Sequence, residues 1–221
     1  MYKILAKTLI IGKKVVYLPS CHSTNEYASN LTKKTSWFEG TVVITDNQFQ
    51  GKGQMGNVWE SEAHKNLMFS LLLKPKFIPV NEQFQLSMAV ALGIVDALNS
   101  YDNSCEIKWP NDIYCNNKKV GGILIQNSIH KTNLDHSIVG IGLNVNQTSF
   151  NSPNATSLRL IMHETFHLGD LWEKLCNTLE RRYLQLKQGH SKELKSEYFD
   201  NLLGYKQSRI YNDGQAFEGQ I

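Results

Sequence analysis

The sequence predicts an α+β fold, with a mainly antiparallel or mixed sheet flanked by helices. Apolar, β-branched segments dominate the first two thirds of the chain and arrive in pairs, with a helical pattern between only some of them. The last third instead shows two helical patterns in succession. The chain has 221 residues, of which 41% are apolar, and this is enough for one core domain with a small appendage.

The N-terminal elements are expected to be a strand, a helix and two further strands. "VVYLPSCHSTNEYASNLTKK" indicates a strand, a short loop and a helix, because Ser23 and Glu26 have the spacing of a capping box. "GTVVITDNQ" and "NLMFSLLLKP" are typical of buried strands, and Pro75 ends the second. The glycine-rich segment "QFQGKGQMGNVWES" joins these two strands.

The middle of the chain predicts a core helix followed by a strand and a hairpin. From Glu82 to Tyr101 apolar residues recur at helical spacing, with Gly93 as the weakest point of the helix. The strand "EIKW" stops at Pro110, and "KKVGGILIQNSIHKTNLDHSIVGIGLNVN" indicates two strands around a polar turn near residues 130–136. A polar loop, "TSFNSPNATS", follows the hairpin.

The C-terminal part is expected to be helical and to end in a short hairpin. An amphipathic pattern between Gly169 and Gly189 predicts one helix, and a shorter one is expected over residues 191–202. In the tail, the triplet at 212–214, Asn-Asp-Gly, marks a turn between two short strands.

Charge, the N-terminal segment and the cysteines limit the classes of partner and the cellular compartment expected for this chain. The net charge is +3 with both signs scattered, so no basic tract indicates nucleic-acid binding. The N-terminal apolar run "LII" is too short for a signal peptide or a membrane span. No C-x-x-C pair is present, so neither a zinc site nor a disulfide framework is expected, and reduced thiols in a cytoplasm fit best. The four cysteines are Cys21, Cys105, Cys115 and Cys176.

Gly51, Gly53 and Gly56 have the G-x-G-x-x-G spacing of a dinucleotide-binding turn. That turn must follow a strand and open a helix, whereas this segment leads into another strand, so a Rossmann domain is excluded. The glycines instead predict a flexible loop whose backbone approaches an anionic or planar ligand. An ordinary mobile hairpin loop is the alternative.

Four motifs together resemble the biotin protein ligases: "STN" at 23–25, "GKGQMGNVW" at 51–59, "KWPNDIYCNNKKVGGIL" at 108–124 and "GIGLNVN" at 140–146. The resemblance covers roughly residues 20 to 205. It implies a class II synthetase-like catalytic domain of the biotin and lipoate ligases over residues 1–203. Residues 204–221 would then begin a truncated or abbreviated SH3-like β-barrel. The roughly twenty residues before the first motif are too few for an N-terminal helix-turn-helix.

The resemblance implies an ATP-dependent, two-step ligase reaction. Biotin's carboxylate attacks the α-phosphate of ATP to give biotinyl-5′-AMP and pyrophosphate, and a lysine of a biotin carboxyl carrier protein then takes the biotinyl group. ATP and biotin are the expected substrates, and Mg²⁺ is expected with ATP. No residue is assigned as a metal ligand, neither nucleic acid nor a membrane is an expected partner, and a homodimer is left open.

Three residues are expected to carry the catalysis: Lys119, Asp112 and Lys52. Lys119 matches the family lysine that bridges the biotin carboxylate and the α-phosphate; the alternative is a solvated charge in the turn "NNKK". Asn111 and Asp112 match residues at the nucleotide side, and Asp112 is also a candidate base for the acceptor lysine; the alternative is an Asx-turn that only closes the strand. Lys52 matches an arginine of the glycine-rich loop.

The resemblance also assigns two overlapping sets of binding residues. Hydroxyl and amide groups complement biotin's fused urea, which has one carbonyl acceptor and two N–H donors. The biotin-binding set is Ser23, Thr24, Asn25, Gln48, Lys52, Gly53, Gln54, Lys119 and Gly122. The ATP- or adenylate-binding set is Gly51, Lys52, Gly53, Gln54, Trp59, Asn111, Asp112, Lys119 and Asn144. A helix cap at Ser23, core packing by Trp59 and a strand-end amide at Asn144 are the respective alternatives.

The glycine-rich loop departs from the family form G-R-G-R-x-G. Lys52 keeps a positive charge without the planar fork of arginine, Gln54 loses the charge, and Asn57 replaces a further basic residue. The hypothesis is that biotinyl-AMP is held less tightly here. Residues 49–58 are also expected to be mobile without ligand and ordered by biotinyl-AMP.

Two other functions stay open. A lipoate or octanoate ligase or transferase shares the implied fold and also modifies a carrier lysine, although the W-P-N-D and K-x-G-G-I-L combination resembles the biotin enzymes. A non-catalytic biotin- or nucleotide-binding module is the second alternative. Transfer of biotin to a carrier domain in a single turnover separates these functions.

Overall fold

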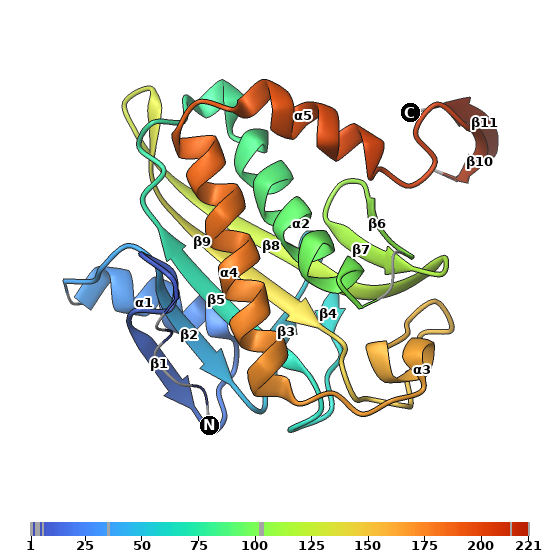
Figure 1. Ribbon diagram of the computed structural model, residues 1–221, viewed down its shortest axis with the longest axis horizontal. Coiled ribbons are helices and arrows are strands. Elements are labelled where there is room, and N and C mark those ends of the chain that lie inside the picture. Colours follow the sequence, from blue (N-terminus) through green and yellow to red (C-terminus); the bar gives the residue numbers. More distant parts are fainter. Residues whose placement is uncertain are drawn as a thin grey trace.

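The computed structural model of the chain describes residues 2, 5, 7–34, 36–101, 104–212 and 214–220. Seven strands form one sheet in the order β1-β2-β5-β9-β8-β7-β6 (Figure 1). Only β1 and β2 pair in parallel, and every other neighbouring pair in this sheet is antiparallel. This mixed sheet with flanking helices confirms the predicted fold class.

The strands of the main sheet match most of the predicted segments. They are β1 (Val15–Leu18), β2 (Thr41–Thr45), β5 (Leu67–Leu73), β6 (Cys105–Lys108), β7 (Asp112–Cys115), β8 (Lys118–His130) and β9 (Asn133–Leu143). Two separate hairpins are β3 (Gly51–Lys52) with β4 (Val58–Trp59), and β10 (Ser208–Asn212) with β11 (Ala216–Gln220).

The helices also match the expected positions, with one addition. They are α1 (Thr24–Lys34), α2 (Phe84–Asn99), α3 (Leu158–Met162), α4 (Leu168–Lys187) and α5 (Ser191–Asp200). The short helix α3 was not predicted, since its five residues lie next to the polar loop. None of the helices in the described part of the chain has the length and apolar run that a bilayer crossing requires.

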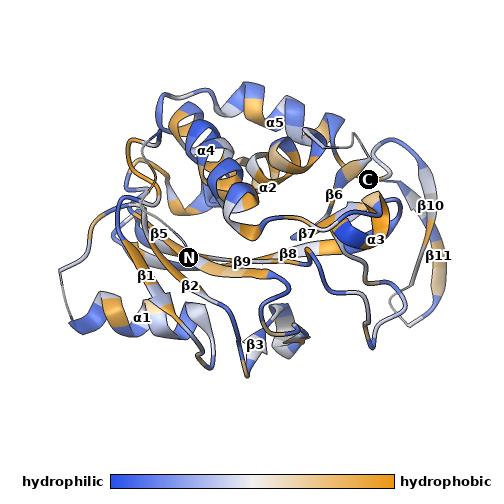
Figure 2. Ribbon diagram, turned by 60° about the horizontal axis from the view of Figure 1, so that its bottom comes forward, coloured by the Kyte–Doolittle hydropathy of each residue, from blue (hydrophilic) through white to orange (hydrophobic). Residues whose placement is uncertain are grey.

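One face of the sheet, called here the core face, packs under α2 and α4, with α5 beside them (Figures 1 and 2). Trp172 of α4 stands edge-on against Phe69 of β5, with 5.1 Å between the ring centroids, and both are buried. The helices meet at Gly93, where an added Cβ would lie 2.9 Å from Cα of Leu179. Gly93 therefore permits the close approach of α2 and α4, whatever it costs in helix propensity.

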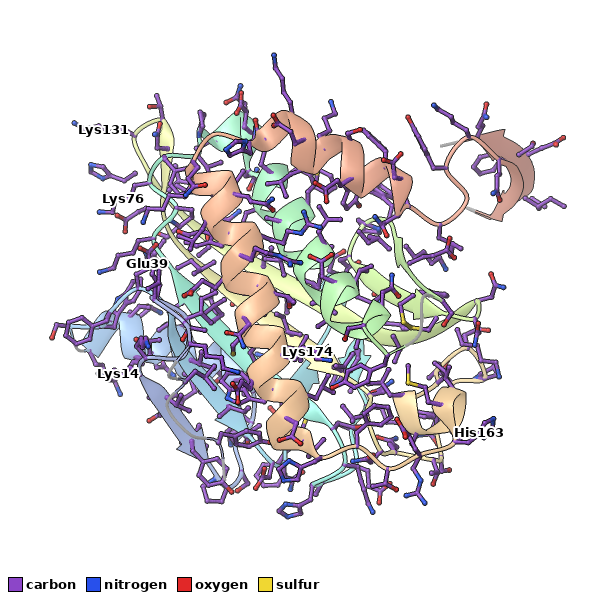
Figure 3. The ribbon with its side chains drawn as sticks, in the orientation of Figure 1. Lys14, Glu39, Lys76, Lys131, His163 and Lys174 are labelled. Carbon is purple, nitrogen blue, oxygen red and sulfur yellow. A yellow bond between two sulfur atoms is a disulfide. The ribbon has the colours of Figure 1, made fainter. Side chains whose placement is uncertain are left out.

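Charged groups fasten the rim of this core. Glu39, labelled in Figure 3, accepts a 2.6 Å hydrogen bond from the Tyr183 hydroxyl, and its other oxygen lies 3.3 Å from Nζ of Lys187. Burial, together with that hydrogen bond to Glu39, raises the pKa of the Tyr183 hydroxyl. These contacts tie the segment before β2 to α4.

The opposite face, called here the site face, carries α1 and the β3–β4 hairpin (Figure 2). Because side chains alternate along a strand, β5 turns Leu67, Phe69 and Leu71 to the core face and Ser70 and Leu72 to the site face. A small apolar cluster under α1 anchors that helix: Ala28, Val43, Leu72 and Ile138. The rest of the site face is left for a pocket.

Strand β7 was not predicted, because "DIYC" is short and directly follows the turn at Pro110. It pairs with β6 on one side and with β8 on the other. The turn between β8 and β9 lies at residues 131–132, shorter than the expected polar turn. In the tail, the turn between β10 and β11 was predicted at 212–214, but Asp213 lies outside the described residues.

The expectation that all four cysteines are reduced is wrong for Cys105 and Cys115, which form a disulfide. They are directly opposite each other in the antiparallel pair β6–β7, with their Cα atoms 4.1 Å apart. The two cysteines are ten positions apart in the sequence. Because β7 was not predicted, no expected strand pairing brought them together. Cys21 and Cys176 are free thiols.

Candidate functional site

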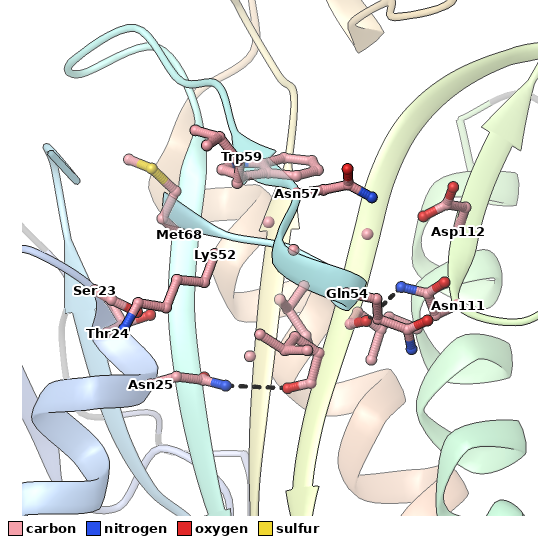
Figure 4. Close-up of a pocket in the computed structure, with 18 of the residues that line it drawn as sticks. Ser23, Thr24, Asn25, Lys52, Gln54, Asn57, Trp59, Met68, Asn111 and Asp112 are labelled. Atoms are coloured by element: carbon pink, nitrogen blue, oxygen red, sulfur yellow. Dashed lines mark hydrogen bonds between the residues drawn. The ribbon is translucent and has the colours of Figure 1, made fainter. Parts of the chain in front are cut away.

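A cavity of about 250 Å³ lies on the site face, between the start of α1, the β3–β4 hairpin and strands β7 and β8 (Figure 4). The structure brings twelve of the predicted site residues to its walls. They are Ser23, Thr24, Asn25, Gln48, Lys52, Gly53, Gln54, Trp59, Asn111, Asp112, Lys119 and Gly122. Gly51 and Asn144 are not among the lining residues.

Lys119 and Asp112 form an ion pair in the wall of the cavity, with 2.6 Å between Nζ and Oδ1. Two residues with positive φ, Asn116 and Asn117, make the tight turn from β7 to β8 that brings Asp112 and Lys119 onto adjacent strands. The side chains of Asp112 and Lys119 are only 22% and 33% exposed, respectively. The positive charge of the Lys119 amine is therefore balanced by Asp112 before any ligand arrives. Nζ of Lys119 also lies 5.8 Å from the ring centroid of Trp59.

Asn111 closes the start of β7 against β8. Its Nδ2 donates to the carbonyl of Ile123 at 2.9 Å, and the N–H of Ile123 donates back to the carbonyl of Asn111 at 2.9 Å. The amide therefore holds in place the strand end from which Asp112 projects.

Trp59 packs against the strands of the site face. A Cβ added at Gly142 would lie 2.5 Å from the Trp59 ring, and one at Gly122 would lie 3.1 Å from it. These two glycines therefore make room for the indole. Among the described residues, Nε1 of Trp59 is buried and has no hydrogen-bond partner.

Polar side chains at the start of α1 form a hydrogen-bonded cluster. The N–H of Thr24 donates to Oε1 of Gln48 at 2.9 Å, and Nδ2 of Asn25 donates to the carbonyl of Leu124 at 3.1 Å, across the cavity floor (Figure 4). Ser70 of β5 lies beneath, with its Oγ 2.8 Å from Oγ1 of Thr24 and 2.6 Å from Oδ1 of Asn25. The cluster spans α1, β5 and β8, which are far apart in sequence.

Lys52 reaches the cavity from the β3–β4 hairpin. Its Nζ lies 3.2 Å from Oε2 of Glu26 in α1, and both side chains are at least half exposed. The N–H of Gly53 donates to the carbonyl of Asn57 at 2.7 Å, closing a short 3₁₀ turn over Gln54–Gly56. Strand β4 follows the glycines, so the exclusion of a Rossmann turn is confirmed. Mobility of this segment without ligand stays a prediction.

Asn144 and Gly51 lie outside the lining of the cavity. Asn144 is 3% exposed, and its Nδ2 donates to the carbonyl of Thr156 at 3.0 Å. The N–H of Thr156 donates in turn to the carbonyl of Lys119, so Asn144 supports the backbone beside Lys119. Gly51 pairs with Trp59 in the β3–β4 hairpin, and an added Cβ would lie 2.5 Å from the carbonyl oxygen of Trp59.

Sequence reasoning missed four residues that shape this site: Glu26, Ser70, Gly140 and Gly142. Ser70 reads as one more residue of a buried apolar strand. The spacing of Gly140 and Gly142 places both glycines on one face of a strand, and this was the one available indication that a ligand or ring lies against it.

Within the described residues, no group of three or more His, Cys, Asp and Glu side chains is placed to hold a metal ion. Asp112 is the only carboxylate among the described lining residues, and it is paired with Lys119. The described lining residues therefore offer a divalent cation at most one carboxylate ligand.

Residues 17–144 match the model of the biotin/lipoate A/B protein ligase family. The bifunctional ligase/repressor BirA of Bacillus spizizenii is 33% identical over 183 residues, which cover 80% of this chain and 56% of that protein. The biotin--[acetyl-CoA-carboxylase] ligase of Paracoccus denitrificans is 34% identical over 154 residues, 67% of this chain and 62% of that protein. The chain thus spans little more than half the length of these relatives.

The fold is also similar to solved structures. A biotin protein ligase of Aquifex aeolicus in complex with biotin and ATP superposes with a TM-score of 0.78 at 28% identity, covering 94% of this chain and 86% of that one.

Proposed function

This chain belongs to the biotin/lipoate A/B protein ligase family, and from that premise we propose that it joins biotin to ATP as biotinyl-5′-AMP and then to a lysine of a biotin carboxyl carrier protein. One observation carries the proposal: the same cavity holds Lys119, which is ion-paired with Asp112, beside a cluster of amide and hydroxyl groups. The matched Aquifex protein was solved with biotin and ATP.

The polar cluster at the start of α1 is the proposed seat of biotin's ring system. Its hydroxyl and amide groups complement a fused urea. The indole of Trp59, which packs against Gly122 and Gly142, forms an apolar wall of the same cavity. The acid tail would then extend toward Lys52 and Lys119.

The first step requires two anions, the carboxylate and the α-phosphate, to meet. A carboxylate oxygen forms the new bond to phosphorus while the bond to pyrophosphate breaks, and negative charge builds on the transferring phosphoryl group. Lys119 is proposed to stabilise that charge and Lys52 to hold the carboxylate. Asp112 keeps the Lys119 ammonium directed into the cavity, since its carboxylate lies 2.6 Å away. The glycine-loop backbone would approach the adenylate.

The second step requires a neutral acceptor lysine. At pH 7.4 only about one lysine in a thousand is neutral, which corresponds to about 4 kcal/mol that positioning, desolvation or a base must offset. Asp112 is the proposed base, because it is the one carboxylate among the described lining residues. The amine forms the amide bond, and AMP leaves.

The setting of the enzyme is part of the proposal. Mg²⁺ would arrive as Mg-ATP, and the need for ATP and a carboxylase carrier favours the cytoplasm. Residues 1–203 would make up the catalytic domain, and residues 204–221 would begin a truncated or abbreviated C-terminal β-barrel. The pairing of β10 with β11 in a sheet of their own supports this division. A homodimer stays an expectation that sedimentation of the purified chain would test.

Transfer of labelled biotin to an isolated carrier domain in a single turnover tests the proposal. We expect ATP-dependent labelling of one carrier lysine with biotin and at most about one hundredth as much with lipoate, because a dithiolane ring cannot use the polar cluster. Labelling with lipoate at an equal rate would favour the lipoate function. Binding of biotin without any transfer would indicate a non-catalytic module.

A further inference from the structure

We propose that the buried hydroxyl of Ser70 sets the direction of the hydrogen bonds in the polar cluster, so that Thr24 meets the ligand as an acceptor and selects rings that carry N–H groups. Ser70 would be a positioning residue for substrate specificity. The inference rests on the proposed function, because it names the part of biotin that the cavity recognises.

Ser70 lies below the cavity, outside reach of a ligand. It is fully buried on the site face of β5, and it is not among the residues that line the cavity. Its Oγ lies 2.8 Å from Oγ1 of Thr24 and 2.6 Å from Oδ1 of Asn25. Any effect of Ser70 on a ligand must therefore pass through these two side chains.

A main-chain carbonyl at one end fixes the direction of the whole chain of hydrogen bonds. The carbonyl of Leu124 can only accept, so Asn25 turns its Nδ2 toward it, at 3.1 Å. Oδ1 of Asn25 then faces Ser70, and this oxygen also can only accept. The single proton of Ser70 therefore goes to Asn25.

With its own proton committed to Asn25, Ser70 can only accept from Thr24. The Thr24 hydroxyl has two oxygens within reach, Oγ of Ser70 at 2.8 Å and Oε1 of Gln48 at 3.4 Å. The shorter contact is the normal length for a bond between hydroxyls, and the longer one is weak. Thr24 therefore donates to Ser70 and presents only lone pairs to the cavity.

Gln48 adds a second hydrogen-bond acceptor on the side of the cavity where Thr24 lies. Its Oε1 already accepts the N–H of Thr24 at 2.9 Å, which orients the amide oxygen toward the same corner. A ligand group placed there meets acceptor oxygens, so it must be a donor. Biotin's urea offers two N–H groups, whereas the dithiolane ring of lipoate offers none.

Substitution of Gly140 disturbs the same chain of hydrogen bonds in a second, independent way. A Cβ added there would lie 2.4 Å from Oδ1 of Asn25, too close for the amide to keep its place. Asn25 can occupy its position only because residue 140 has no side chain.

The test compares Ser70→Ala with Leu72→Val, a change on the same strand and the same face that removes apolar volume and no hydrogen bond. Biotin and lipoate affinities are measured by calorimetry, and kcat and KM by pyrophosphate exchange. We expect Ser70→Ala to raise the Kd and KM for biotin about tenfold, since the freed Thr24 proton no longer points away from the ligand. The KM for ATP, kcat and the Kd for lipoate should stay within about twofold, as no hydrogen bond to them is lost.

The ratio of the two affinities is the deciding readout. It should fall about tenfold in Ser70→Ala and also in Gly140→Ala, and stay constant in Leu72→Val. Equal weakening of biotin and lipoate in Ser70→Ala, or an unchanged ratio in both Ser70→Ala and Gly140→Ala, would overturn the inference while leaving biotin ligation intact. A wild-type chain that fails to bind biotin would instead overturn the proposed function, and this inference with it.

Discussion

The two faces of the main sheet are made by the same strands, yet they differ in composition around the site. On the core face, β5 and β9 present large apolar side chains such as Phe69, Val139 and Ile141 to α2 and α4. On the site face, the alternate residues of these strands include Ser70, Gly140 and Gly142. The difference indicates that the core face supplies most of the stability, while the site face gives up side-chain volume to hold a ring, an amide and a ligand.

The largest expected effect is on the core face. Trp172→Ala removes a fully buried ring that packs on Phe69, so the free energy of unfolding should fall by about 3–5 kcal/mol. Urea unfolding measures the loss. The KM for biotin should not change under conditions where the variant is still folded, and a raised KM there would contradict the division between the two faces.

Removing the disulfide is expected to have the next largest effect on stability. Cys105 and Cys115 belong to the apolar core, although their hairpin also carries Asp112. Replacing both by serine should lower the free energy of unfolding by about 2–3 kcal/mol in oxidising buffer. Adenylate formation should persist, and mass spectrometry after alkylation checks the bond. Full labelling of both thiols in the native wild-type protein would contradict the bond itself.

The same substitution, glycine to alanine, can be made on each face of the sheet and compared directly. Gly142→Ala must displace Trp59, so we expect kcat/KM for adenylate formation to fall about 10- to 100-fold with little loss of stability. Gly93→Ala is the matched change on the core face, where the new Cβ meets Leu179. It should lower the melting temperature and leave kcat/KM unchanged. The reverse result for this pair would break the comparison.

The smallest effect is expected at Gln54, in the glycine-rich hairpin that borders the cavity. Gln54→Arg restores a charge that the family loop usually has, so release of biotinyl-AMP should slow about fivefold. Stopped-flow measurement of adenylate release, with Asn57→Gln as a neutral control in the same hairpin, checks it. Equal release rates for wild type and Gln54→Arg would refute the hypothesis that this loop retains the adenylate weakly.

Local patterns were enough to predict most of the fold. The helical spacing of α2 and α4 and the β-branched runs of β2 and β5 depend on nearest neighbours in the sequence, and these segments were located correctly. Strand β7 was missed because its four residues, which include Asp112, are ordered by pairing on both sides.

The site was only partly predictable, for a related reason. Motifs led to Lys119 and Asp112 because the family resemblance carries them, and the structure places them together. Ser70 and Glu26 act through partners 26 to 46 residues away, which no local pattern shows. The disulfide was missed for a different reason, because it depends on the pairing of β6 with β7, a strand that was not predicted.

Biotin-dependent exchange of pyrophosphate into ATP, measured for wild type and Lys119→Met beside their thermal unfolding, tests the central claim most directly. We predict exchange with biotin in the wild type, a loss of at least about 100-fold in Lys119→Met, and the same melting temperature for both, since Lys119 lies on the site face and outside the apolar core. Unchanged exchange in Lys119→Met, or exchange that disappears only because the variant unfolds, would contradict the account.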